Sequence, residues 1–230
     1  MKRVAILQSN YIPWKGYFDI IGMVDLFIFH DDLQYTKNDW RNRNKIKTPN
    51  GVQWLTIPCG TSENRLICDV TMKDYSWQRK HWSVISQNYR KAPFFEHYKS
   101  LYEEFFLSRQ WDYLSKLNQY IIMKISKEVF GFDTEFGDSR EYNLTKVKEE
   151  RVIELLTKAK ADVYLSGPSA KNYISEQVFN DNNIQIEWMD YSGYPKYPQQ
   201  YGEFVHGVTV LDLIFNVGAN AIDNIKARKA

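Results

Sequence analysis

Cysteine is nearly absent from this sequence of 230 residues, which contains only Cys59 and Cys68. The two lie nine positions apart and form no CxxC pattern, so a reduced cytosolic protein is favoured over a disulfide-stabilised fold. No apolar run approaches the ~20 residues that a membrane span needs, and the apolar stretch Val4–Leu7 is too short for a signal-peptide core. The sequence therefore predicts a cytoplasmic protein without a membrane span.

An excess of positive charge is also missing, since 30 Lys and Arg face 28 Asp and Glu and the net charge is +2. Proteins that bind nucleic acid through electrostatics carry a pronounced basic excess, so no nucleic-acid partner is expected. Aromatic residues are abundant instead, at 16% of the chain with 16 Tyr and 7 Trp. Tyr and Trp combine an apolar body with a polar tip and therefore suit the walls of half-buried pockets.

Short apolar runs predict a β-strand at Val4–Leu7, a helix at 15–24 and a second strand that begins the segment LFIFHDD. This order is typical of a parallel βαβ unit. Residues 36–50 are dominated by Asn, Lys and Arg and predict a long loop. Residues 52–60 and 68–72 predict two strands for an antiparallel pair.

The middle of the chain has helical periodicity over 75–89, 94–108 and 111–129. An alternation of strands and helices follows, with strands predicted at 132–136, 161–167 and 184–191 and helices at 146–160, 170–180 and 208–226. The pattern predicts an α/β fold with a mainly parallel, Rossmann-like sheet, of which a nucleotidyltransferase-like sheet is one form. We expect a single domain over residues 1–230 with a helical insertion at about 75–130.

The stretch QSNYIPWKGYFD follows the first predicted strand, and ligands of parallel sheets bind outside the carboxyl ends of strands. Gln8, Tyr11, Trp14 and Lys15 are therefore candidate binding residues. Gly16 permits close approach of a ligand at the start of the next helix, where free N–H groups attract anions. The structural alternative is a Pro–Trp contact that only packs the turn.

The stretch HDDLQYTKNDWRNRNKI follows the second predicted strand. His30, Asp31 and Asp32 are candidates for a general base or a ribose contact, although adjacent strand residues alternate faces and do not predict a metal site. Several cations in and after this stretch could hold phosphate or carboxylate, and its Asn residues could orient a sugar. These cations are Lys37, Arg41, Arg43, Lys45 and Lys47. The alternatives are a solvated basic loop or a nucleic-acid arm in which Trp40 is interleaved with cations.

The stretch LSGPSAKNY predicts a strand, an anion-binding turn through Ser166 and Gly167, and a helix. Lys171 would lie in the first turn of that helix, where the helix dipole disfavours a cation, so a ligand explains it better than helix stability does. The alternative is a structural turn with a solvated lysine, and the Walker pattern of P-loops is absent. His206 precedes the last predicted helix and is a second candidate base, although a lone histidine is more often structural.

Five motifs resemble the WbqC-like protein family, in the order LQSNYIPWKGYFDII, DDLQYTKNDWRNRNKI, WLTIPC, YLSGPSAKNYI and YPQQYGEFVHGVTVLDLIFNVG. Ser9, Ala170 and Thr209 depart from the family pattern, which has Pro, Gly and Ser there. Ser9 makes the first turn less rigid, and Ala170 weakens the case for an anion-binding turn. The positions that match the family are Gln8, Tyr11, Pro13, Trp14, Gly16, Asp32, Gln34, Trp40, Asn42, Arg43, Asn44, Ser166, Gly167, Lys171, Tyr173, Tyr197, Gln199 and Asp212.

The resemblance implies a bacterial transferase of cell-surface polysaccharide (O-antigen type) biosynthesis that joins a small acyl or aminoacyl group, such as glycine, to a nucleotide-linked amino sugar. Tyr11, Trp14 and Trp40 would then stack on the sugar or base. Arg43 and Lys171 would hold phosphate or a developing oxyanion. Asp32, or in second place His206, would take the proton of the attacking amine. The expected co-substrate is an activated acyl donor.

Two alternatives belong to other functional classes. The first is nucleotidyl transfer or amino-acid adenylation, which needs a nucleoside triphosphate with Mg²⁺. The segment Trp14-Lys15-Gly16-Tyr17 stands where nucleotidyltransferases carry an H-x-G-H signature, and both signature histidines are missing. The second is a non-catalytic module that binds a sugar nucleotide or another small molecule.

Overall fold

The central sheet contains five parallel strands. The structure is a computed structural model, and it describes residues 1–172 and 174–227. Across the sheet the strands are ordered β5 (Glu135–Asp138), β2 (Leu26–Phe29), β1 (Arg3–Leu7), β6 (Val163–Ser166) and β7 (Gln185–Trp188). The predicted α/β fold with a mainly parallel, Rossmann-like sheet is therefore confirmed.

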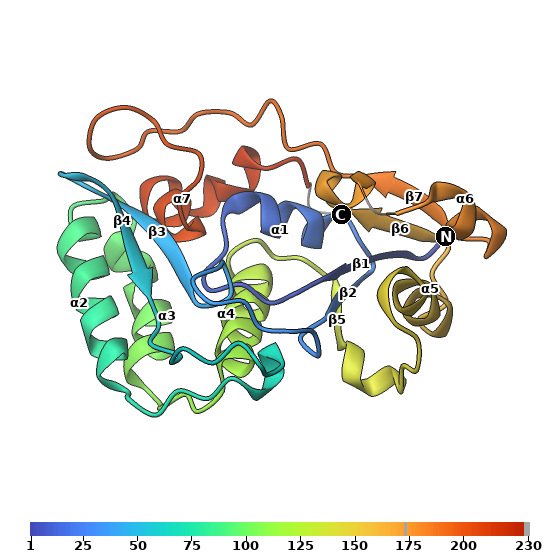
Figure 1. Cartoon of the computed structure of the whole chain (residues 1–230). Helices are drawn as coiled ribbons and strands as arrows, with labels where there is room; N and C mark the ends of the chain where they lie inside the picture. Colours follow the sequence, from blue (N-terminus) through green and yellow to red (C-terminus); the bar gives the residue numbers. More distant parts are fainter. Residues whose placement is uncertain (173, 228–230) are drawn as a thin grey trace.

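Helices cover both faces of this sheet (Figure 1). Within the described residues the α-helices are α1 (Lys15–Gly22), α2 (Ser76–Tyr89), α3 (Phe95–Leu107), α4 (Leu114–Glu128), α5 (Lys148–Lys158), α6 (Glu176–Asp181) and α7 (Val210–Val217). Ala5 of β1 belongs to the core shared with α1, α4 and α7, whereas Val4 and Ile6 belong to the core shared with α5 and α6. A parallel sheet buried on both faces needs apolar residues at successive positions, which explains the unbroken apolar runs of the first two strands.

A β-hairpin of β3 (Arg43–Thr48) and β4 (Gly51–Thr56) forms a second, two-stranded sheet. Figure 1 shows the hairpin together with α2 and α3 at one end of the molecule and β6 and β7 at the other. Helices α2, α3 and α4 occupy the range of the predicted insertion, and the single-domain organisation stays a prediction. Across the described residues, every helix is too short or too polar to span a lipid bilayer.

The loop prediction for residues 36–50 was wrong, because Arg43–Thr48 form β3 and pair antiparallel with β4. The inward-facing side chains of this segment include Asn42, Asn44 and Ile46, all of which are buried. Two of the three are amides rather than apolar groups. The alternation of a half-buried strand was therefore invisible as a pattern of hydrophobicity.

The predicted antiparallel pairing of 52–60 with 68–72 was also wrong, since β4 pairs with β3. Ile67–Asp69 form a 3₁₀ helix instead. The backbone N–H groups of Ile67 and Cys68 donate to the carbonyls of Leu33 and Asp31, each at 2.9 Å. The segment therefore runs beside the chain that leaves β2.

Three further predictions were wrong in their boundaries. A 3₁₀ helix, Pro168–Asn172, and the short helix α6 replace the continuous helix predicted at 170–180, because Ser175 between them is extended. The last predicted helix ends at Val217, since Gly218 adopts a φ of +62° and begins a 3₁₀ helix. Strand β5 starts at Glu135, three residues later than predicted.

Candidate functional site

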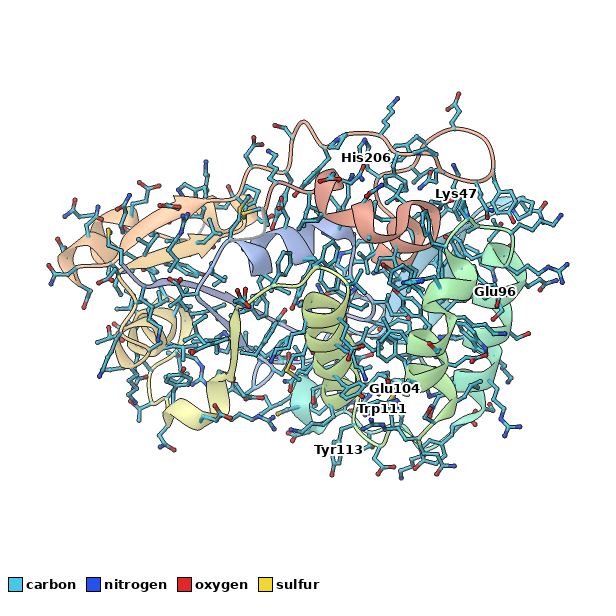
Figure 2. All side chains as sticks on the ribbon, turned by 180° about the vertical axis from the view of Figure 1, so that it is seen from behind. Lys47, Glu96, Glu104, Trp111, Tyr113 and His206 are labelled. Carbon is cyan, nitrogen blue, oxygen red and sulfur yellow. The ribbon has the colours of Figure 1, made fainter. Side chains whose placement is uncertain are left out.

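A pocket of about 340 Å³ lies where the loop after β1 meets the hairpin and the loop before α7. We call it the aromatic pocket, and its lining residues are Asn10, Pro13, Trp14, Trp40, Asn44, His206 and Gly207. Figure 2 shows His206 on the long loop that precedes α7. Four residues predicted for the site, from three separate stretches, therefore contribute to one cavity: Trp14, Trp40, Asn44 and His206.

The loop after β1 is held in a strained conformation by residues of and near the hairpin. Ile12 has a φ of +41°, a region that β-branched residues rarely occupy. The buried amide of Asn44 donates to the carbonyl oxygens of Tyr11 (3.0 Å) and Ile12 (2.8 Å). The carbonyl of Trp40 accepts from the Tyr11 N–H at 2.8 Å. Because strained backbone persists only where its surroundings over-determine it, these bonds fix the shape of the pocket wall.

Other aromatic rings support the indole of Trp14 in the pocket wall. The indole of Trp14 contacts the rings of Tyr191 and Tyr194 at centroid distances of 5.3 and 5.8 Å. Gly16 packs against the same indole, and a Cβ added there would lie 2.3 Å from the Cζ2 atom of Trp14. Gly16 therefore serves the packing of Trp14, because a side chain at this position would displace the indole.

Two polar side chains of the aromatic pocket are available to a ligand. The Oδ1 atom of Asn10 is buried and has no hydrogen-bond partner among the described residues, so a hydroxyl or amine of a bound molecule would satisfy it. Burial, with help from the charges of Lys15 and Lys196, lowers the pKa of His206 below its ordinary value of 6.5. His206 is therefore a neutral imidazole at pH 7, able to accept a proton.

Lys15 brings a buried cation close to this pocket. Its Nζ atom donates to the carbonyl of Pro195 at 3.1 Å and lies 4.9 and 5.3 Å from the ring centroids of Tyr194 and Tyr197. Burial lowers the pKa of Lys15 to about 8, and the nearby carboxylate of Asp19 opposes this shift. Lys15 was singled out in the sequence, and here it contributes positive potential behind the wall formed by Trp14.

A family match spans all the stretches that line the pocket. A sequence profile of the WbqC-like protein family matches residues 8–224. The chain belongs to this family. It is 43% identical over 228 residues to an uncharacterized protein of Mycobacterium tuberculosis, and the alignment covers 98% of both chains. No solved structure shows a significant match to the chain.

Other positions that match the WbqC-like motifs hold the loop before α7 in place. The buried carboxylate of Asp212 accepts from the hydroxyls of Tyr89 (2.9 Å) and Tyr197 (2.7 Å) and from Nε2 of Gln199 (2.6 Å). The Oε1 atom of Gln199 accepts from Nζ of Lys47 at 2.8 Å. We call these five residues the Asp212 network. Tyr197, which is buried, and Gln199, which is half-buried, were predicted as substrate-binding residues; they lie in this network and do not line the aromatic pocket.

Tyr11 and Asn42 are two more motif residues that the structure places in the interior. The hydroxyl of Tyr11 is hydrogen-bonded to Nδ1 of His81 at 2.7 Å, and burial lowers the pKa of His81 to about 4. The side-chain amide of Asn42 donates to the carbonyl of Ile57 at 3.0 Å. Both residues therefore support the walls of the site from behind.

A second pocket, of about 160 Å³, lies at the carboxyl ends of β1, β2 and β6, and we call it the switch-point pocket. The strand order reverses its direction between β1 and β6, which is where ligands bind in open α/β sheets. Gln8 and His30, both named from the sequence, line it together with Glu149 and Val152 of α5. Burial is the main cause that lowers the pKa of His30.

Asp32, the preferred candidate base, lies beside His30 and not in the aromatic pocket. Its carboxylate forms an ion pair with Arg151 and accepts from the hydroxyl of Ser139. The Oδ1 atom of Asp32 is 3.7 Å from Nε2 of His30. Because the Asp32 carboxylate is already engaged by Arg151 and Ser139, this placement favours a structural role for Asp32.

The structure does not bring together the two cations predicted to hold a phosphate or oxyanion. The guanidinium carbon of Arg43 lies 4.2 Å from the ring centroid of Trp54, on the hairpin. The Nζ atom of Lys171 lies 5.3 Å from the ring centroid of Trp188, on β7. The hairpin and β7 are at opposite ends of the molecule in Figure 1.

The remaining predicted residues that the structure describes do not line the aromatic pocket. Ser166 is buried at the end of β6 and Gly167 follows it, but a five-residue 3₁₀ helix takes the place of the expected α-helix, so the predicted anion-binding turn lacks a helix behind it. Gln34 is exposed and forms an isolated bridge with Leu66. Tyr173 lies outside the described residues. Among the described residues, no three His, Cys, Asp or Glu side chains are grouped closely enough to hold a metal ion.

Sequence reasoning missed two residues of this region. Asn10 stands alone between the first strand and the aromatic motif, and only its place directly after a strand end could have drawn attention to it. Trp54 was assigned to a strand but not to the site. Its position opposite Lys45 in the hairpin register would have been apparent if β3 had been recognised.

Proposed function

We propose that the protein is a cytoplasmic transferase that joins a small acyl or aminoacyl group, such as glycine, to the amine of a nucleotide-linked amino sugar. The observation that carries this proposal is the aromatic pocket, in which two indoles, an unpartnered amide oxygen and a neutral histidine line one cavity. The setting in cell-surface polysaccharide (O-antigen type) biosynthesis rests on membership of the WbqC-like family.

The pocket has the size and chemistry for one sugar ring. Its volume of about 340 Å³ is at the lower end of the range for small-molecule sites, roughly 300–1,000 Å³. The apolar face of a sugar packs on aromatic side chains, here Trp14 and Trp40, while its hydroxyls need polar partners. Oδ1 of Asn10 accepts from such a hydroxyl.

In the proposed reaction the sugar amine attacks the carbonyl carbon of an activated acyl donor such as a thioester. The carbon–nitrogen bond forms, the carbon–sulfur bond breaks, and the thiolate leaves with the bonding electron pair. The neutral imidazole of His206 takes the proton from the amine and passes it to the thiolate. His206 has this role in place of Asp32, whose carboxylate is held by Arg151.

Transfer is tested by mixing the purified protein with uridine or thymidine diphosphate amino sugars and with acyl thioesters or aminoacyl donors, and by detecting the amide by mass spectrometry. We expect His206→Asn to lower kcat about 100-fold, a typical contribution of a general base. Because desolvation and nearby cations lower the pKa of His206 below its ordinary value, the acidic fall of the rate should occur at a lower pH than an unperturbed histidine would give. His206→Asn should lose this acidic limb.

His97→Asn is the matched control, because His97 is an exposed histidine on α3 that lines neither pocket. An activity of His206→Asn within tenfold of the parent would remove the base role. Binding of a nucleotide amino sugar without product from any donor would replace the transferase with the binding-module alternative.

The switch-point pocket favours a second candidate, nucleotidyl transfer or amino-acid adenylation, because its position at the strand-order reversal is where α/β sheets bind nucleotides. This candidate predicts pyrophosphate release from a nucleoside triphosphate with Mg²⁺. Release should be lost in His30→Ala and unchanged in His206→Asn, which is the opposite of the pattern expected for acyl transfer.

A further inference from the structure

The outer face of the hairpin carries an exposed aromatic pair next to the pocket. The indoles of Trp40 and Trp54 have their centroids 5.6 Å apart at an interplanar angle of 37°. They are 43% and 39% exposed, which is unusual for tryptophan in a protein whose other large rings are mostly buried. Trp40 also lines the aromatic pocket, so the exposed pair extends the pocket outward.

Two cations lie over these rings without an acidic partner. Arg43 stacks 4.2 Å above the Trp54 ring, and Nζ of Lys45 lies 4.7 Å from the centroid of Trp54 and 5.7 Å from that of Trp40. Neither cation forms an ion pair with any residue that the structure describes, whereas the neighbouring Arg41 pairs with Asp39. Nε of Arg43 is in addition buried without a hydrogen-bond partner in the described chain.

This arrangement distinguishes between two kinds of ligand. A neutral saccharide stacks on tryptophan but makes no use of two unpaired positive charges. A nucleoside diphosphate supplies both a planar base for an indole and an anionic group for Arg and Lys. Alternate residues of β3 place Arg43 and Lys45 on the same face of the strand, so both reach one diphosphate.

We propose that the hairpin face binds the nucleoside diphosphate of the nucleotide-linked sugar, with Arg43 and Lys45 on the diphosphate and Trp54 stacked on the base. The sugar would then enter the aromatic pocket past Trp40. This inference deepens the proposed function and rests on it for the identity of the group in the pocket. It also gives the predicted phosphate-binding role to Arg43 with Lys45 and not with Lys171.

The test measures binding of UDP, dTDP, uridine and the neutral sugar chitotetraose to the purified full-length protein by isothermal titration calorimetry at two salt concentrations. We expect UDP or dTDP to bind without a sugar attached, and more weakly at high salt. Arg43→Ala with Lys45→Ala should weaken UDP binding about tenfold or more and remove most of the salt dependence. Trp54→Ala should weaken UDP and uridine alike, about tenfold.

Arg109→Ala is the matched control, because Arg109 also lies over an indole, 4.8 Å from the ring centroid of Trp111, but is paired with Glu104. Figure 2 shows Trp111 near the lower edge of the molecule and His206 near its upper edge, so this variant should bind UDP like the parent. Melting temperatures of all variants exclude loss of fold as the cause of weaker binding.

Each outcome separates this inference from the proposed function. Amide formation with unchanged UDP-sugar affinity in the Arg43, Lys45 and Trp54 variants would overturn the hairpin site and leave the transferase intact. UDP binding that depends on these residues, without amide formation, would leave the hairpin site intact and remove the transferase. Binding of chitotetraose that depends on Trp54, with no binding of UDP or dTDP, would overturn the inference in favour of a saccharide chain.

Discussion

The Asp212 network and the aromatic pocket both draw on β3 and on the loop before α7, yet their polar atoms differ in how many hydrogen-bond partners they have. Asp212 accepts three side-chain hydrogen bonds, and Gln199 both donates and accepts. In the aromatic pocket, Oδ1 of Asn10 has no hydrogen-bond partner among the described residues. Beside the pocket, Arg43 and Lys45 form no ion pair with a carboxylate of the described residues, whereas Arg41 pairs with Asp39. The hydrogen bonding of the polar side chains therefore separates the residues that hold the loop before α7 from those that face a ligand.

The largest loss of stability is expected when the Asp212 network is broken. Asp212→Ala leaves the buried hydroxyls of Tyr89 and Tyr197 without their acceptor and takes one acceptor from the Gln199 amide, so the free energy of unfolding should fall by about 3–5 kcal/mol. Urea denaturation measures this loss. Asp212→Asn keeps a carbonyl acceptor and should cost less, and a loss below about 1 kcal/mol in Asp212→Ala would show that the network is not needed for stability.

A smaller effect on stability is expected at Lys15, whose buried amine donates to the carbonyl of Pro195. Its pKa of about 8 lies below the unfolded value, so between these values the unfolded chain binds more protons and stability rises with pH. The parent should therefore gain roughly 2 kcal/mol relative to Lys15→Met between pH 7 and 9.5. Urea denaturation of both proteins at the two pH values gives this difference. Parallel pH curves for the two would mean that the Lys15 amine is not desolvated.

The smallest effect on stability is expected at Asn10, whose Oδ1 atom has no hydrogen-bond partner among the described residues. Asn10→Ala should leave the melting temperature unchanged and weaken a bound amino-sugar nucleotide about fivefold, the value of one neutral hydrogen bond. Calorimetric titration and thermal denaturation measure the two quantities. If Asn10→Ala lowered stability and left affinity unchanged, Asn10 would have a structural role, as the Asp212 network does.

The parts of the structure that the sequence predicted well are those specified by apolar pattern. Strands β1 and β2 and helices α2, α3 and α4 follow from runs or periodic spacing of apolar residues. Strand β3 escaped prediction because Asn44 occupies an inward position, where it bonds to the strained loop instead of packing in a core. A side chain used in this way is recognised only once its distant partners are known.

The candidate site could be predicted in its residue types but not in its grouping. Trp14, Trp40, Asn44 and His206 line one pocket as expected of site residues. Asp32 and Lys171 were expected at the same place, but the carboxyl edge of the sheet is long enough to hold them apart from it. Motif order along the chain does not specify which strand ends share a ligand, because this depends on how the hairpin and the loop before α7 fold over α1.

The aromatic pocket also has a consequence for biosynthesis of the protein. Asn10 leaves the ribosome 196 residues before His206, so the two halves of the pocket wall are made far apart in time. The first two strands can pair as soon as they emerge, since they are neighbours in sequence and in the sheet. A chain that stops before His206 would thus carry all five strands of the sheet and no complete pocket, and ligand binding would have to wait until the loop before α7 is made.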